Sequence, residues 1–163
     1  MAIHLKGFIM ADFSLNDFKQ KLGEEFGPFS IDFEHKGEEV TLKIASFMTA
    51  TPEEQVKFTR RYGIVGAFIS GEASDADILE ATGLTEEQLS EMEDSEIVEL
   101  LSRKMMEAIK TPLRRLADNK RVFDSFAAQM PDTLVAWFML VGTYFKKYNL
   151  FGVNEEDEGN LGK

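Results

Sequence analysis

Apolar residues at helical spacing are densest between residues 131 and 148. Pro131, Asp132 and Thr133 are typical of a helix start, because a Thr or Asp side chain can accept a hydrogen bond from the first free amides. Large side chains then share one face, at Leu134, Trp137, Phe138, Val141, Tyr144, Phe145 and Tyr148. Burial of such side chains contributes about 1.5–3 kcal/mol each. The pattern predicts a central helix that makes the largest local contribution to a core.

The opposite face of this predicted helix changes along its length. Its first half is also apolar, through Val135, Ala136, Met139 and Leu140. Its second half carries Thr143, Lys146 and Lys147. We therefore expect the first half to be enclosed and the second half to have a solvent-exposed side.

Two interpretations of the aromatic face stay open. In one, the whole helix is a core element. In the other, the end from Tyr144 to Phe151 remains partly open and binds a partner helix or peptide, because aromatic side chains with a polar tip favour such surfaces. The residues of this candidate partner-binding surface are Trp137, Phe138, Val141, Tyr144, Phe145, Tyr148 and Phe151.

The N-terminal part of the chain predicts a helix. Ser14, followed three residues later by Asp17, forms an approximate capping box. Gly27-Pro28 is a stop signal. Between them one apolar face is formed by Leu15, Phe18, Leu22 and Phe26. The preceding residues 3–10 are either a short strand or a loose leader, and Met10 leaves the start codon open.

Residues 29–44 carry the clearest β pattern. Apolar and polar residues alternate over 29–34 and again over 40–44. Residues 35–38 supply a turn, in which Gly37 can adopt a positive φ. We expect a β-hairpin, and one of its faces must pack on another element, since a hairpin alone is marginally stable.

After Met48 the pattern is helical. Thr51-Pro52-Glu53-Glu54 starts a helix that we expect to reach Ser70. Further starts are predicted at Ser74, Thr85 and Ser95, and Thr111-Pro112 and Asp118-Asn119 are expected to separate shorter helices before the central one.

These elements predict an α+β fold that is mostly α. A helix and β-hairpin occupy 1–47, a helical bundle occupies 48–152, and a tail covers 153–163. The tail contains four consecutive acidic residues, 155–158. We expect it to be flexible, because it cannot bury enough apolar surface to become ordered.

Composition narrows the function. The 163 residues carry 18 basic and 29 acidic side chains, a net charge of −11, which argues against a nucleic-acid partner. With no cysteine, disulfides and thiolate chemistry are excluded. The N-terminus is a poor signal peptide, and the longest apolar run, 134–141, is far shorter than the roughly 20 residues of a membrane span. We expect a soluble intracellular protein with no membrane partner.

No catalytic constellation emerges from the sequence. His4 and His35 lack the spacing of helical metal ligands. SDAD at 74–77 fits a helix cap better than a calcium loop. The acidic residues between 86 and 96 fit a solvated helix face. The basic pairs Arg60-Arg61, Arg114-Arg115 and Lys146-Lys147 fit ion-pairing positions, with contact to an acidic partner as the alternative. We expect neither an enzyme nor a metal or cofactor site.

The order of features resembles that of the tail assembly chaperones of long-tailed bacteriophages. The resemblance is carried by the helix and hairpin at 13–44, the acid-rich helical region, the segment LADNKRVFDSFAAQMPDTLVAWFMLVGTYFKKY at 116–148 and the acidic end NEEDEGNLGK. It implies a non-catalytic role: coating the helical tape measure protein, in many copies, until tail tube subunits polymerise around it in the host cytoplasm. Gly162-Lys163 is compatible with the slippery codons at which this family shifts frame.

Two other functions remain as alternatives. One is a structural component of the virion, such as a head–tail connector or a tail terminator. The other is a small acidic regulator that binds a host protein. An assembly chaperone is expected to be absent from the mature virion, whereas a connector or terminator is retained there.

Overall fold

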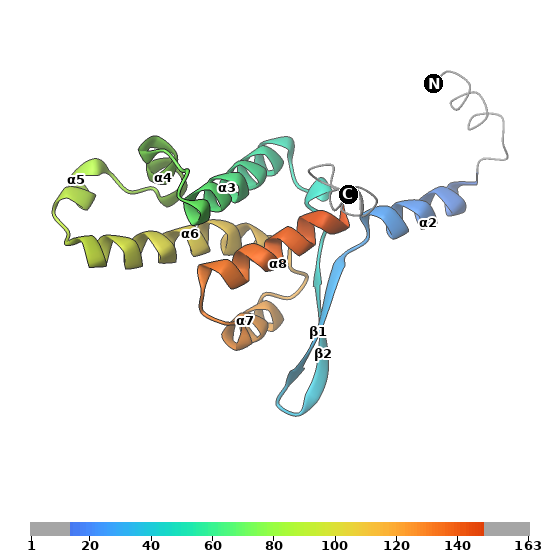
Figure 1. The fold of residues 1–163 in the computed structure, drawn as a ribbon. Coiled ribbons are helices and arrows are strands. Elements are labelled where there is room, and N and C mark those ends of the chain that lie inside the picture. Colours follow the sequence, from blue (N-terminus) through green and yellow to red (C-terminus); the bar gives the residue numbers. More distant parts are fainter. Residues whose placement is uncertain (1–13, 149–163) are drawn as a thin grey trace, which may run out of the picture.

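The computed structural model describes residues 14–148, which form seven α-helices, one short 3-10 helix and a two-stranded hairpin (Figure 1). The elements in chain order are α2 (Leu15–Phe26), β1 (Phe29–His35), β2 (Glu38–Ile44), η1 (Phe47–Thr49), α3 (Pro52–Ser70), α4 (Asp75–Thr82), α5 (Glu86–Ser90), α6 (Asp94–Leu116), α7 (Lys120–Gln129) and α8 (Leu134–Lys147). The predicted α+β class, mostly α, is confirmed. The predictions for the leader at 3–10 and for the tail at 153–163 lie outside the described residues.

Side-chain caps start most of the helices at the predicted positions. Before α3, the Thr51 hydroxyl accepts from the Glu54 amide at 3.3 Å, and the Glu54 carboxylate accepts from the Thr51 amide at 3.2 Å. Ser74 caps α4 by accepting from the amide of Asp77, as expected for the SDAD segment. These bonds satisfy amides that have no partner inside the helix.

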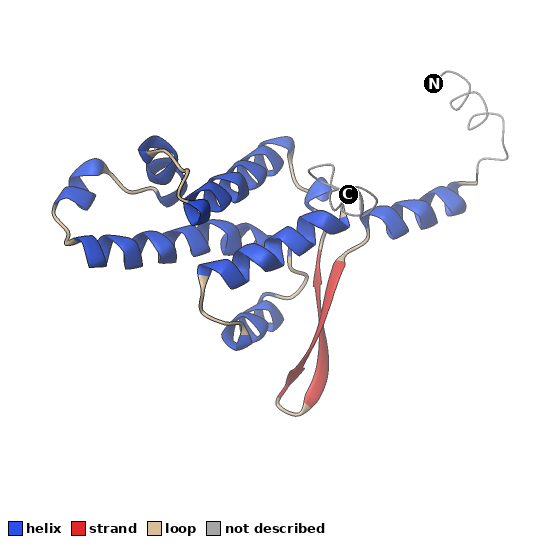
Figure 2. Ribbon diagram, in the orientation of Figure 1, coloured by secondary structure: helices blue, strands red, loops and turns tan. Residues whose placement is uncertain are grey.

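The β-hairpin turns where predicted, within residues 35–38, and its loop consists of the two residues Lys36 and Gly37. Lys36 and Gly37 both have a positive φ, 53° and 79°, which matches the right-handed twist of paired strands. Phe29 pairs with Ile44 at the open end of the hairpin. Figure 2 shows that the two strands form a ribbon that extends from the helical body.

The apolar face of the hairpin packs on the helices. The ring of Phe29 lies 5.7 Å from that of Tyr144, and the ring of Phe33 lies 5.6 Å from that of Phe126. Leu42 and Ile44 are fully buried. This is the cover that the hairpin needs for stability.

Helix α6 is longer than the sequence predicts. We expected a break at Thr111-Pro112, but α6 continues through Pro112 to Leu116. A proline removes one intrahelical hydrogen bond and disfavours a helix interior. Here the last turn is fixed from outside, because Leu113 is fully buried and the Leu116 carbonyl accepts from the Ala45 amide at 2.8 Å. Tertiary contacts therefore outweigh the local preference for a break.

One core crosses the boundary proposed near Met48. Leu42 and Ile44, from the first part, belong to the same buried cluster as Trp137 and Val141. Backbone hydrogen bonds also join the parts, since the Asp118 amide donates to the Lys43 carbonyl at 2.9 Å. The change near Met48 is thus a change of secondary structure within a shared core.

The central helix α8 begins after the Thr133 cap as predicted, but its first half is not enclosed. Val135 is 52% exposed and Met139 is 66% exposed. The other elements pack mainly on the aromatic side of α8. On the opposite side Ala136 and Leu140 are half-buried, and Leu140 packs against the core. The second half has the expected exposed side, at Thr143, Lys146 and Lys147.

Candidate protein-binding surface

The aromatic face of α8 lies in the core of its own chain. Relative exposure is at most 8% for the following residues: Trp137, Val141, Tyr144, Phe145 and Tyr148. Phe138 is partly buried, and Phe151 lies outside the described residues. The interpretation that this end of the helix stays open is therefore wrong for Tyr144, Phe145 and Tyr148. As a surface for a partner, this face is closed in the structure.

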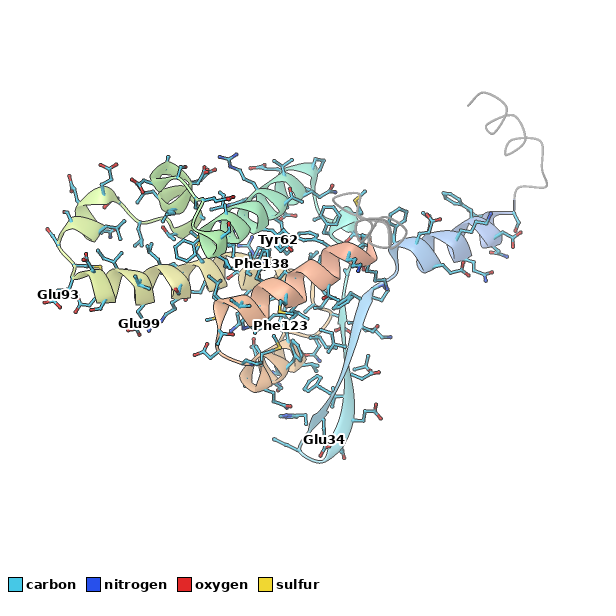
Figure 3. The ribbon with its side chains drawn as sticks, in the orientation of Figure 1. Glu34, Tyr62, Glu93, Glu99, Phe123 and Phe138 are labelled. Carbon is cyan, nitrogen blue, oxygen red and sulfur yellow. The ribbon has the colours of Figure 1, made fainter. Side chains whose placement is uncertain are left out.

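Rings from two other helices, α7 and α3, help to close the aromatic face. From α7, Phe123 lies 6.0 Å from Trp137 between ring centroids. From α3, Tyr62 stacks on Phe138 at 4.6 Å with an interplanar angle of 11°, and Figure 3 shows these two rings between the two helices. The hydrophobic gain of burying large rings is the physical reason that this face turns inward.

The polar tips of the buried tyrosines also have partners inside the chain. The Tyr144 hydroxyl donates to the Ala45 carbonyl at 2.7 Å, and the Tyr148 hydroxyl donates to the Gly27 carbonyl at 2.6 Å. Burial raises the pKa of both phenols. These hydroxyl groups serve the fold of the chain.

The apolar face of α2 has the opposite environment. Figure 1 shows α2 projecting away from the other labelled elements. None of its residues is buried. The exposed fractions of its apolar side chains are 59% for Leu15, 38% for Phe18, 40% for Leu22 and 37% for Phe26. We call these four residues the α2 row.

The α2 row has the geometry of a helix-binding surface. Its members recur at intervals of three or four residues, so they lie along one side of the helix. The polar side of α2 carries charged residues of both signs, including Lys19, Lys21, Glu24 and Glu25. A helix of this kind binds another apolar helix or groove through its row of anchors.

The position of α2 is set by the end of α8. The Tyr148 hydroxyl donates to Gly27, and the Lys147 ammonium group donates to the Pro28 carbonyl at 2.8 Å. Gly27 and Pro28 form the junction between α2 and β1. The aromatic helix therefore contributes to the candidate surface indirectly, by holding the base of α2.

The remaining charged groups are consistent with a solvated surface. Every acidic side chain between 86 and 96 is exposed, and Figure 3 shows Glu93 at the far end of the body. His35 lies at the hairpin turn, and His4 is outside the described residues. Between residues 14 and 148, no group of three or more His, Cys, Asp or Glu side chains is placed to hold a metal ion.

The arginine pairs follow the prediction in part. Arg60 donates to both carboxylate oxygens of Glu80, at 2.8 and 2.7 Å. Arg114 donates to Asp124 in the same two-pronged way, at 2.7 and 3.0 Å. The second arginine of each pair, Arg61 or Arg115, forms no ion pair with an acidic side chain among residues 14–148.

No helix among the described residues is both long enough and apolar enough to span a membrane. The chain matches no family model, no curated protein and no solved structure.

The sequence contained the signal for the α2 row but did not show its exposure. Periodicity identifies which face of a helix is apolar. It does not identify which of several apolar faces finds cover inside the chain. Both α2 and α8 have such a face, and the packing of the whole chain determined that α8 is covered.

Proposed function

We propose that this protein is a non-catalytic assembly chaperone for phage tails, which covers apolar helix surface on the tape measure protein. The observation that carries the proposal is the α2 row, where Leu15 and Leu22 are 59% and 40% exposed on a helix without a buried residue. A helix of 12 residues is only marginally stable by itself in water. Its apolar face therefore gains free energy by covering an apolar surface on another molecule.

The charge of the chain supports the same role. A protein that exposes apolar side chains tends to associate with itself, and a net charge of −11 opposes that tendency by repulsion between copies. The row spans only one short helix, so a long helical partner takes many copies along its length. We propose a homo-oligomeric coat on the tape measure protein in the host cytoplasm, released when tail tube protein assembles.

The proposal is tested by co-expression with the tape measure protein encoded next to this chain. The wild-type chain is expected to keep the tape measure protein in the supernatant after centrifugation. Leu22→Glu places a charge in the α2 row and is expected to send most of the tape measure protein to the pellet. Met139→Glu is the matched control, because Met139 is an exposed apolar residue on α8 that lies outside the row.

Two results would overturn the proposal. One is a tape measure protein that stays insoluble with the wild-type chain. The other is equal solubility with Leu22→Glu and with Met139→Glu. Detection of the chain in finished virions would instead support a structural component of the connector or terminator.

A further inference from the structure

The second arginine of each of the two arginine pairs, Arg61 and Arg115, has no acidic partner among residues 14–148. Arg61 and Arg115 form no ion pair there, whereas their neighbours Arg60 and Arg114 do. Unpaired guanidinium groups beside an apolar surface are suited to binding carboxylates, because they present several donors in a fixed plane. The pair therefore needs an explanation that the α2 row does not provide.

Arg61 and Arg115 line the same pocket, between α3 and the end of α6. The apolar wall of this pocket is formed by Phe47, Phe58, Pro112 and Leu116. Its free volume is about 60 Å³. Sites for metabolites and cofactors usually measure about 300–1,000 Å³, so this pocket fits one side chain of a peptide rather than a free metabolite.

The charge of the pocket is positive. Lys57 adds a third basic group, and Glu54 is the acidic residue in the lining. The Glu54 carboxylate already accepts a hydrogen bond from the Thr51 amide. Partial burial, followed by the nearby charge of Arg115, lowers the pKa of Arg61. A carboxylate placed between the two arginines would relieve that repulsion.

The chain itself carries a suitable acidic segment within reach. Phe145, in the last turn of α8, lies 4.8 Å from Phe58 and 5.6 Å from Phe47 between ring centroids, so α8 ends beside the pocket wall. The acidic segment 155–158 begins seven residues after Tyr148. Seven residues span up to about 23 Å, and the last turn of α8 already lies beside Phe47 and Phe58 of the pocket wall.

We propose that the acidic segment 155–158 of the same chain docks into this pocket, with a carboxylate held between Arg61 and Arg115. Attachment to the same chain favours the contact, since the tether gives the segment a high effective concentration. The contact is partly exposed, so salt weakens it. This inference is independent of the proposed function, because it does not involve the α2 row.

The test uses the full chain with a nitroxide spin label near its end. The chain has no cysteine, so Asn160→Cys gives a single attachment site. If the segment docks, the nitroxide is expected to broaden the amide NMR signals of residues 54–61 and so lower their intensity severalfold. The reference is the same protein after chemical reduction of the nitroxide. The broadening is expected to disappear in R61Q/R115Q, and to weaken at about 0.5 M NaCl because the charges are screened.

A matched control separates the pocket from the overall charge. R103Q/R121Q removes the same number of positive charges at exposed positions outside the pocket lining, and the broadening should persist. If R61Q/R115Q does not fold, E155Q/E156Q/D157N/E158Q removes the other partner and should abolish the broadening. The proposal would be overturned if R61Q/R115Q or the four-residue acidic variant showed the same broadening as the wild type. It would also be overturned if the wild type showed no broadening.

A mixed sample distinguishes one chain from two. Spin-labelled protein without isotope is added to ¹⁵N-labelled protein without spin label. Little broadening is expected if the segment docks within its own chain. Broadening as strong as in the protein that carries the spin label and ¹⁵N on the same chain would show docking between copies and would overturn the proposal.

Discussion

The hydroxyl of Tyr148 donates a hydrogen bond to the backbone oxygen of Gly27 at 2.6 Å, between residues 121 positions apart. The bond joins the end of the central helix to the base of α2. Lys147 makes a second such bond to Pro28. A residue that the sequence placed in a partner-binding surface therefore positions a different surface, the α2 row.

Removal of this hydroxyl should loosen α2. Tyr148→Phe keeps the ring but leaves the Gly27 oxygen without this donor, at an expected cost of about 0.5–1.5 kcal/mol in unfolding free energy. Hydrogen exchange of the last α2 amides should accelerate more than that of α3. Lys146→Gln, at an exposed neighbour, should change neither quantity. Unchanged exchange in α2 would contradict the anchoring role.

Two neighbouring positions on α8 should respond very differently to truncation. Trp137 is 1% exposed and Met139 is 66% exposed. Trp137→Ala is expected to cost about 3–5 kcal/mol, because it removes a large buried ring and leaves a cavity. Met139→Ala should stay within about 0.5 kcal/mol of wild type. Urea denaturation measures both, and similar losses would contradict the assignment of the two faces.

Glycines 63 and 66 of α3 give a test of helix contact. A Cβ at Gly63 meets nothing within 4 Å, whereas at Gly66 it meets the Phe138 ring at 3.2 Å. Gly63→Ala should stabilise the protein by about 0.5–1 kcal/mol, the usual helix preference for alanine. Gly66→Ala should gain less or lose stability, because Phe138 is also stacked on Tyr62. Equal gains in thermal denaturation would show that this contact is loose.

The carboxyl group of Asp124 should titrate at an unusually low pH. The hydrogen bond from Arg114, and then its charge, lower the pKa of Asp124. A lowered pKa in the folded state stabilises the protein above the ordinary aspartate pKa of about 3.9. That contribution is lost as the pH falls through the lower folded value.

Carboxyl ¹³C shifts measured against pH provide the check. Arg114→Gln should return the pKa of Asp124 toward its ordinary value, because both interactions are removed. Arg103→Gln, at an arginine that pairs with Glu99 instead, should leave it unchanged. A normal pKa of Asp124 in the wild-type protein would contradict the ion pair.

Local elements could be predicted well because their causes are local. The caps at Thr51, Ser74 and Asn119 each act within three residues of a helix start. The turn at Lys36-Gly37 is likewise set by a short sequence. The continuation of α6 through Pro112 was missed because its cause is distant, in contacts with the strand that ends at Ile44.

Apart from the continuation of α6 through Pro112, the sequence by itself determined which segments are helical, which pair as a hairpin and which side of each helix is apolar, since these depend on residue spacing and neighbouring side chains. Only the tertiary structure decided which apolar sides are covered. Burial is a property of the whole packed chain: α8 packs on α3 and α6, and its Tyr144 meets Phe29 of the hairpin, while α2 projects with its row exposed. Competition among apolar faces for a single core has no signature in any one segment, and that competition moved the candidate binding surface from α8 to α2.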